Sequence, residues 1–198
     1  MDISFATIDN GVYADHLGLS NLSPITVYPS TDSPARVYNE HIRQSKSKYI
    51  CFCHADVLCH GFKEAIERTI ETYPDFGALG AVGSNKGTKW GRKGQIQEVI
   101  TVDSCCIVIN REHGLLFDQE TFREYHLFVE NMCMQIRATG RKIYTIDIDG
   151  YENEPDLAPS TDHFIHCSQT CHKLGFAWGN YQRFRHILNN KWHDVETT

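Results

Sequence analysis

A histidine and an aspartate interrupt the otherwise apolar stretch YICFCHADV, residues 49–57. Alternation along an extended strand places His54 and Asp56 on the same side. A carboxylate suits Mg2+ or Mn2+, and an imidazole suits Mn2+ better than Mg2+. Together with a downstream His-x-Ser sequence that begins at His166, these residue types indicate a divalent cation held against phosphates. The simpler interpretation is a hydrogen-bonded core histidine and an aspartate that caps a helix or a turn.

Strand-like and helix-like segments alternate along the chain, and their order decides where this pair would lie. The patterns predict strands at residues 3–9, 24–29, 49–57, 77–84, 98–110 and 141–148, and helices within 31–46, 61–76 and 121–140. This alternation predicts an α/β fold with a mostly parallel central sheet flanked by helices on both faces. Ligands in such folds bind beyond the carboxyl ends of the strands, where we expect His54 and Asp56.

The helices carry clear local signals. Apolar side chains within residues 61–76 recur at i, i+3, i+4 and i+7 and form one stripe. Ser33 is a candidate N-cap with Pro34 at the first helical position, and Gly140 is a candidate C-cap for the last long helix.

Composition sets further bounds. The 198 residues, 41% of them hydrophobic, predict one domain over residues 1–198 with the segment 170–198 packed on it. The net charge of -6 argues against a nucleic-acid partner. No apolar run approaches the roughly 20 residues that span a bilayer. No export signal precedes the first strand, so we expect a cytoplasmic location.

The eight cysteines admit two interpretations. In a reducing compartment they are expected to be free thiols rather than a disulfide framework. The alternative is a zinc-binding Cys/His protein, with a site around Cys167 and Cys171, which have His166 and His172 beside them. The lack of any Cys-x2-Cys pair argues against that alternative.

Six segments of the sequence resemble motifs of the family 2 glycosyltransferases, nucleotide-sugar enzymes with the GT-A fold. In chain order they are SPARVYNEHI, YICFCHADV, GALGAVGS, EVITVDSCCIVINREHGLLFDQETF, HLFVENMCMQIRATGRKIYTI and FIHCSQ. The second is similar to the strand that ends in the family's Asp-x-Asp motif, with His54 in place of the first aspartate. The resemblance runs from about residue 3 to about residue 169. The shared order of the segments is specific, although no single segment is.

The resemblance implies a hexosyltransferase that moves a sugar from a nucleotide-sugar to a hydroxyl of a glycan or glycoconjugate acceptor, with UDP favoured over GDP and dTDP. It implies Mn2+ or Mg2+ held by Asp56 and His166, with His54 touching the metal, the phosphate or the ribose. It further implies contacts to the nucleotide or the sugar from Thr7, Asp9, Asp32, Arg36, Asn39 and Asp103.

The chain departs from the family pattern where inverting members place a general base, at the start of the last long helix. Val129 and Asn131 stand where the family has carboxylates. Glu130 is the nearest carboxylate, and His126 would share its helical face at i and i+4, so we expect this pair to act in catalysis. Glu124 is a more distant candidate. In the alternative interpretation Glu130 is a solvated helix residue. The domain would then be a retaining enzyme, a slow enzyme, or a domain that binds nucleotide or glycan without catalysis.

A glycine-rich stretch, NKGTKWGRKG, residues 85–94, carries four positive charges. It could close over a diphosphate as a mobile lid, and Trp90 could stack on a sugar or cover the donor. A solvated surface loop is the alternative.

The aromatic C-terminal segment could pack over the sheet, form an acceptor platform or serve as a subunit interface. The compact chain could also belong with further domains or form a homo-oligomer.

Overall fold

The computed structural model of the chain describes residues 1–9, 22, 24–152, 162–167, 178–193 and 195. The stretch at 12–21, expected to be helical or irregular, and residues 170–177 of the C-terminal segment lie outside the described residues. None of the described helices is long and apolar enough to cross a membrane.

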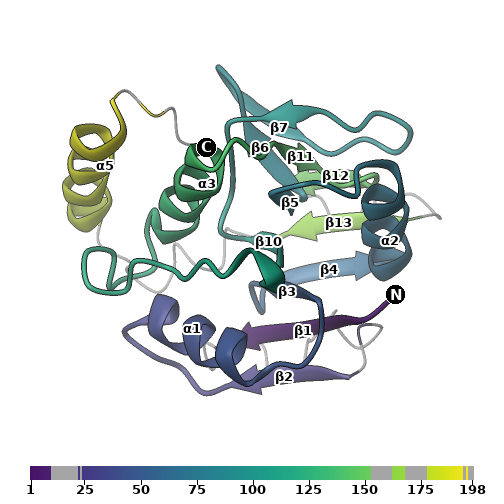
Figure 1. The fold of residues 1–198 in the computed structure, drawn as a ribbon, viewed down its shortest axis with the longest axis horizontal. Coiled ribbons are helices and arrows are strands. Elements are labelled where there is room, and N and C mark those ends of the chain that lie inside the picture. The colour runs from purple at the N-terminus through teal and green to yellow at the C-terminus, as the bar shows by residue number, and fades with distance from the viewer. Residues whose placement is uncertain (10–21, 23, 153–161, 168–177, 194, 196–198) are drawn as a thin grey trace.

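A seven-stranded sheet forms the centre of the fold (Figure 1). Its strands are β1 (Ile3–Ile8), β2 (Ile25–Tyr28), β3 (Tyr49–Cys53), β5 (Ala78–Gly80), β8 (Glu98–Val99), β10 (Cys106–Asn110) and β11 (Ile143–Thr145), in the order β2-β1-β3-β10-β5-β11-β8. β1, β2, β3, β5 and β11 run in one direction, whereas β10 and β8 run against their neighbours. The prediction of a mostly parallel sheet is confirmed.

Helices cover both faces of this sheet. The described helices are α1 (Pro34–Gln44), α2 (Phe62–Thr72), α3 (Phe128–Ala138), α5 (Trp178–Trp192) and the 3-10 helix η2 (Arg111–His113). α1, α3 and α5 contribute to one apolar cluster, and α2 contributes to a second. β3 divides its side chains between the clusters, with Ile50 and Phe52 in the first and Cys51 and Cys53 in the second. Burial on both faces explains why this strand is apolar at every position.

Two three-stranded sheets adjoin the central one. They contain β4 (Val57–His60), β12 (Asp149–Glu152) and β13 (His163–His166) in the order β12-β13-β4, and β6 (Val82–Ser84), β7 (Thr88–Trp90) and β9 (Thr101–Val102) in the order β7-β6-β9. The expected strand at 49–57 is therefore wrong in its second half, because the chain leaves the central sheet after Cys53 and enters another sheet as β4. His54 and Asp56 lie in the turn between sheets rather than along one strand.

Helices α1 and α2 follow the local signals of the sequence. Ser33 occupies the N-cap position of α1 and Pro34 its first helical position, although the Ser33 side chain makes no capping hydrogen bond. α2 ends at Thr72, before Pro74. α2 buries the stripe that its apolar periodicity predicts, and α1 also buries one of its faces.

Helix α3 is shorter than the sequence predicts. It begins at Phe128 rather than near residue 121, because Leu127 at its N-cap has a left-handed φ of 63°. Gly140, with a φ of 85°, follows the helix end as the glycine signal predicts. The late start leaves His126 outside the helix.

Candidate functional site

Two segments far apart in the sequence meet at the carboxyl end of β3. β13 runs antiparallel to β4, and its register sets His166 opposite Val57, the residue after Asp56. The backbone N–H of Cys167 donates to the carbonyl of Asp56 at 2.9 Å and extends this pairing. Strand pairing therefore brings His166 to the turn that carries His54 and Asp56.

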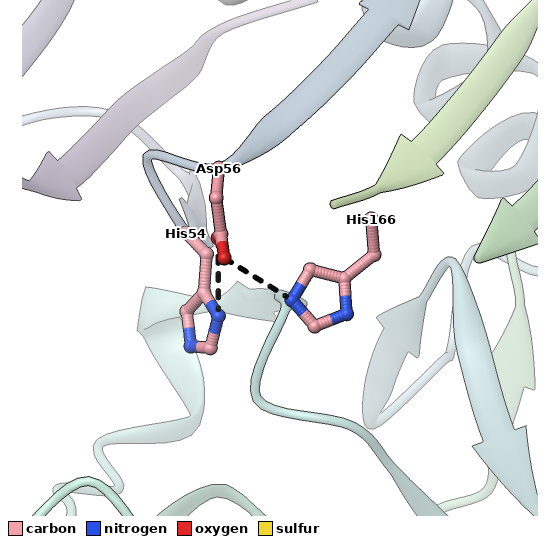
Figure 2. A group of neighbouring side chains, drawn as sticks. All are labelled: His54, Asp56 and His166. Atoms are coloured by element: carbon pink, nitrogen blue, oxygen red, sulfur yellow. Dashed lines mark ion pairs between the residues drawn. The ribbon is translucent and has the colours of Figure 1, made fainter. Parts of the chain in front are cut away.

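Asp56 lies between the two imidazoles (Figure 2). Its Oδ1 is 3.7 Å from His54 Nδ1, and its Oδ2 is 3.7 Å from His166 Nε2. The Asp56 side chain is 1% exposed, whereas those of His54 and His166 are 23% and 14% exposed. Both distances are too long for hydrogen bonds, so these contacts are electrostatic.

These three side chains suit a divalent cation. Their ligand atoms all lie within 4.8 Å of one another. Ligands at about 2.1 Å from an ion lie about 3–3.5 Å apart, so small side-chain movements would close the set. His166 Nε2 is buried without a hydrogen-bond partner among the described residues, as a nitrogen reserved for an ion would be. Two imidazoles and a carboxylate favour Mn2+ or Zn2+ over Mg2+.

The pKa of His54 is lower than that of an ordinary histidine. Burial is the largest cause and His166 lowers the pKa further, whereas Asp56 and Asp103 oppose the shift. A neutral imidazole keeps the lone pair that a cation requires. His54 is therefore in the ligand-competent form near neutral pH.

Two further carboxylates near this site have opposite pKa shifts. Asp103, in the turn before β10, accepts a hydrogen bond from the Cys105 N–H at 2.7 Å. Burial raises the Asp103 pKa, but His166, the Cys105 N–H and His54 outweigh burial, and the pKa lies below its usual value. Glu130 is 4% exposed in the first turn of α3, and burial, assisted by Asp103, raises its pKa to about 8. In such a pair, the carboxylate with the lowered pKa can stabilise positive charge, and the carboxyl group with the raised pKa can transfer a proton.

The structure corrects two sequence-based interpretations around α3. Glu130 is not a solvated helix residue, because its Oε2 is buried and has no hydrogen-bond partner among the described residues. His126 does not share a helical face with it, because the helix begins after His126. The His126 ring instead lies edge-on to that of Tyr181, 5.7 Å away, and burial lowers its pKa. Val129 faces the core, as expected.

Four residues expected near the nucleotide lie beside the first two strands. Thr7 is fully buried near the end of β1, and its Oγ1 has no hydrogen-bond partner among the described residues. Asp9 follows the strand, and its N–H donates to the carbonyl of Tyr28 at 2.8 Å. Asp32 and Arg36 are exposed at the beginning of α1. Thr7 is the member of this set with an unsatisfied polar group.

Asn39 has a structural role that the sequence did not suggest. Its Nδ2 donates to the carbonyl of Phe117 at 2.9 Å and to Gln119 Oε1 at 3.0 Å. Its Oδ1 accepts from the Phe117 N–H at 2.8 Å. Both amide hydrogens are used inside the protein, so Asn39 joins α1 to the segment that leads toward α3.

The glycine-rich stretch is not a loop throughout, because its residues 88–90 form the second strand of a β-hairpin with β6. β7 pairs with β6, and Trp90 packs half-buried against the second apolar cluster. Lys93 Nζ is 3.2 Å from Asp162 Oδ2, and the Lys93 N–H donates to Asp149 Oδ1 at 3.2 Å. Asp162 precedes β13, at the opposite end of that strand from His166, so Lys93 is held away from the cation site.

The thiol of Cys105, which the sequence pattern did not single out, lies at the site. Asp103, Cys105 and His166 form a second group whose ligand atoms lie within 4.8 Å of one another. Burial, followed by the charge of Asp103, raises the pKa of the Cys105 thiol well above its usual value. The spacing in VDSCC was the available signal.

The seven described cysteines are free thiols, as expected, and the zinc site considered around Cys171 and His172 lies outside the described residues.

Comparison with known proteins identifies similar folds but no similar sequences. No known protein family and no curated protein matches the sequence. A crystal structure of GalNAc-T7 with UDP, GalNAc and Mn2+ matches with a TM-score of 0.59 at 8% identity, over 84% of this chain and 44% of that one. S. aureus TarS matches with a TM-score of 0.54 at 11% identity, over 83% and 36%. The structure of TarS 1-349 gives 0.54 at 10% identity, over 99% and 67%.

Both neighbours are glycosyltransferases of the GT-A type. This chain spans less than half of the GalNAc-T7 chain and of the longer TarS chain. The two neighbours share with this chain the large central sheet flanked by helices. Their sequence identity to it is so low that the comparison establishes the architecture alone. The chain has the GT-A fold.

Proposed function

We propose that this chain is a metal-dependent glycosyltransferase that moves a sugar from a UDP-sugar to a hydroxyl of a glycan or glycoconjugate. The observation that carries the proposal is the position of Asp56 between His54 and His166 at the carboxyl end of a central strand. The GT-A fold supports it, and the fold neighbour GalNAc-T7 was solved with UDP, GalNAc and Mn2+.

The charge of the ligand set suits a diphosphate. Asp56, His54 and His166 would hold Mn2+ or Mg2+, which would neutralise the diphosphate as it leaves the sugar. Asp56 supplies one negative charge, and neutral imidazoles add lone pairs without adding charge. A set with one carboxylate therefore leaves net positive charge for the phosphates.

We expect the nucleoside to lie beside β1. The support is the hydroxyl of Thr7, because a buried hydroxyl without a partner is costly unless a ligand satisfies it. Asp9 follows Thr7 at the same strand end and offers a carboxylate for the ribose hydroxyls. Asp32 and Arg36, which are exposed, are the weaker candidates.

We assign proton transfer from the acceptor hydroxyl to Glu130. Its carboxyl group is buried, lies within the electrostatic influence of Asp103 and has a pKa of about 8. A group with a pKa near the working pH can exchange a proton efficiently. Its carboxylate fraction grows as the pH rises toward 8, so proton acceptance improves in that direction. Asp103 stays ionised and can stabilise charge on the sugar side.

A catalytically silent domain that binds nucleotide is the second candidate. Two observations favour it: Val129 is buried where family 2 members place a carboxylate, and His126 lies outside α3. In that case the cation and nucleotide would bind without turnover. The chain could also contribute one domain of a larger enzyme, since it spans 44% of the GalNAc-T7 chain.

Both candidate functions require that the chain binds nucleotide together with a cation. Calorimetry with UDP, with and without Mn2+, tests this requirement. We expect Mn2+-dependent UDP binding that Asp56→Asn abolishes and that Asp75→Asn, at an exposed remote aspartate, preserves. Retained Mn2+-dependent binding in Asp56→Asn would overturn the site assignment.

Release of UDP from UDP-sugars separates the enzyme from the silent domain. UDP-GalNAc is the first donor to test because of the GalNAc-T7 complex, followed by a panel of nucleotide-sugars ranked by thermal shift with Mn2+. Transfer to an acceptor supports the enzyme. Tight binding without turnover across the panel and a range of acceptors supports the silent domain.

A further inference from the structure

A buried thiol lies next to the candidate cation site, in a turn that holds it firmly. Cys105 is fully buried between β9 and β10. Its N–H donates to Asp103 Oδ1 at 2.7 Å, and the Asp103 N–H donates to the carbonyl of Val82 at 3.0 Å. The turn therefore fixes the carboxylate and the thiol side by side.

The chemistry of this second group differs from that of the first. Asp103, Cys105 and His166 offer one oxygen, one sulfur and one nitrogen within 4.8 Å of one another. Thiolate ligands select Zn2+ and softer cations, whereas Mg2+ and Mn2+ prefer oxygen. Zn–S bonds of about 2.3 Å and Zn–N and Zn–O bonds of about 2.1 Å need only small side-chain movements from this arrangement. The group His54, Asp56 and His166 contains no sulfur.

Both groups depend on the same histidine. A neutral imidazole has one nitrogen lone pair for a cation, because its other nitrogen carries a proton. His166 can therefore complete one of the two groups at a time. We propose that Asp103, Cys105 and His166 form a thiol-containing Zn2+ site that competes with the His54–Asp56–His166 site for the imidazole of His166.

Binding at this site exchanges a proton for a metal ion. The Cys105 S–H bond breaks, its proton passes to solvent, and the sulfur lone pair forms the bond to Zn2+. Nothing is oxidised or reduced. A fourth tetrahedral position remains for water or for a substrate group.

The consequence is antagonism between cations. Zn2+ bound by Asp103, Cys105 and His166 draws the His166 imidazole away from Asp56. The Mn2+-dependent affinity for UDP therefore falls as Zn2+ is added. This consequence rests on the proposed function, whereas the zinc site itself does not.

Titration of the full chain with Cd2+, a spectroscopic substitute for Zn2+, tests the site directly. Thiolate coordination produces an ultraviolet sulfur-to-cadmium charge-transfer band, which oxygen and nitrogen ligands do not produce. We expect the band in the wild type, its loss in Cys105→Ala, and a fall in Zn2+ affinity of at least about 10-fold, the least that loss of an outer partner costs. Cys106→Ala, at the neighbouring buried cysteine, is the matched control and keeps the band.

Cys167 is the other thiol near the site, because it follows His166 and its backbone N–H donates a hydrogen bond to the Asp56 carbonyl. A band that survives Cys105→Ala, or that disappears in Cys167→Ala, overturns the proposal. X-ray absorption at the zinc edge of the wild type needs no variant to fold, and a shell of nitrogen and oxygen without sulfur also overturns it.

Asp56→Asn separates this proposal from the proposed function. We expect that variant to lose Mn2+-dependent UDP binding and to keep the thiolate band, whereas His166→Ala should weaken both. Loss of the band in Asp56→Asn would mean that the ion uses the first group, and would contradict a separate site. Absence of Mn2+-dependent UDP binding in the wild type, with the band present, would contradict the proposed function alone.

Discussion

Arg68 Nη2 donates to Asp162 Oδ2 at 3.0 Å and so joins α2 to the residue that precedes β13. Arg68 Nε also donates to Asp147 Oδ2 at 3.0 Å. β13 is thus held at its start by α2 and at its end by the bond between Cys167 and Asp56. The position of His166 depends on both attachments, although the contact of Arg68 lies at the opposite end of β13 from the cation site.

Arg68→Ala should therefore weaken cation binding from a distance. We expect the Mn2+ dissociation constant to rise by about 2- to 5-fold, because exposed ion pairs contribute about 1 kcal/mol or less. The variant should also unfold at a lower temperature. Calorimetry with Mn2+ measures the first effect, and Arg43→Ala, at an exposed arginine of α1, is the control. An unchanged constant would mean that β13 keeps its register without this attachment.

His166→Ala should remove a cation ligand while leaving the fold intact. Its side chain is partly exposed and its Nε2 makes no hydrogen bond among the described residues, so little stability is lost. We expect Mn2+-dependent UDP affinity to fall by at least about 10-fold. His163→Ala on the same strand is the matched control, because His163 pairs with His60 at the other end of β4. Equal losses in both variants would indicate a general effect on β13 instead of a ligand role.

Thr7→Val tests the nucleoside side of the site. Valine keeps the shape of threonine and removes a hydroxyl that has no partner among the described residues, so stability should be unchanged or slightly higher. UDP affinity should fall by about 2- to 10-fold if that hydroxyl bonds the nucleoside. Thr26→Val on β2, at an exposed position, controls for the substitution itself. Unchanged UDP affinity would remove Thr7 from the site.

Much of the fold follows from local sequence. The strands β1 and β2 and the helices α1 and α2 lie where periodicity and caps predict them. The break after Cys53 does not follow, because HADV continues an extended pattern, and pairing of β4 with the distant β13 decides where the chain turns. Leu127 is similar, since a leucine gives no signal for the left-handed conformation that starts α3.

The candidate site could be proposed from the sequence in part, because one short segment carries two of its residues. His54 and Asp56 could be selected from spacing, and His166 from its His-x-Ser sequence. The burial of Glu130 could not be predicted. A shift of one residue along a helix is enough to turn a carboxylate from solvent into the core. Cys105 was hidden among eight cysteines, and only the three-dimensional fold brings it to His166.

Asn39→Ala should destabilise the protein without changing the site. The substitution removes three hydrogen bonds and leaves the Phe117 N–H without its partner, whereas the Phe117 carbonyl still accepts from the Gln119 N–H at 2.9 Å. We expect the free energy of unfolding to fall by on the order of 3 kcal/mol, measured by urea denaturation. Gln44→Ala, exposed at the end of the same helix, should cost little. UDP affinity should be unchanged; a large loss would restore Asn39 as a nucleotide contact.

Glu130→Gln should abolish sugar transfer and keep UDP binding. Glutamine preserves the shape of the side chain but cannot accept the proton, and loss of a general base costs about 100-fold or more in turnover. UDP release and calorimetry measure the two effects. Unchanged turnover would remove Glu130 from catalysis.

The same variant should alter how stability depends on pH. The pKa of Glu130 rises from 4.5 in the unfolded chain to about 8 in the folded protein, so the folded state holds a proton that the unfolded state has lost between those values. The wild type therefore loses stability relative to Glu130→Gln as the pH rises through that window, by on the order of 5 kcal/mol in all. Urea denaturation across this range measures the difference, with exposed Glu71→Gln as the control. Parallel profiles for the wild type and Glu130→Gln would mean that Glu130 is ionised in the folded protein, and that its charge is compensated by groups beyond Asp103.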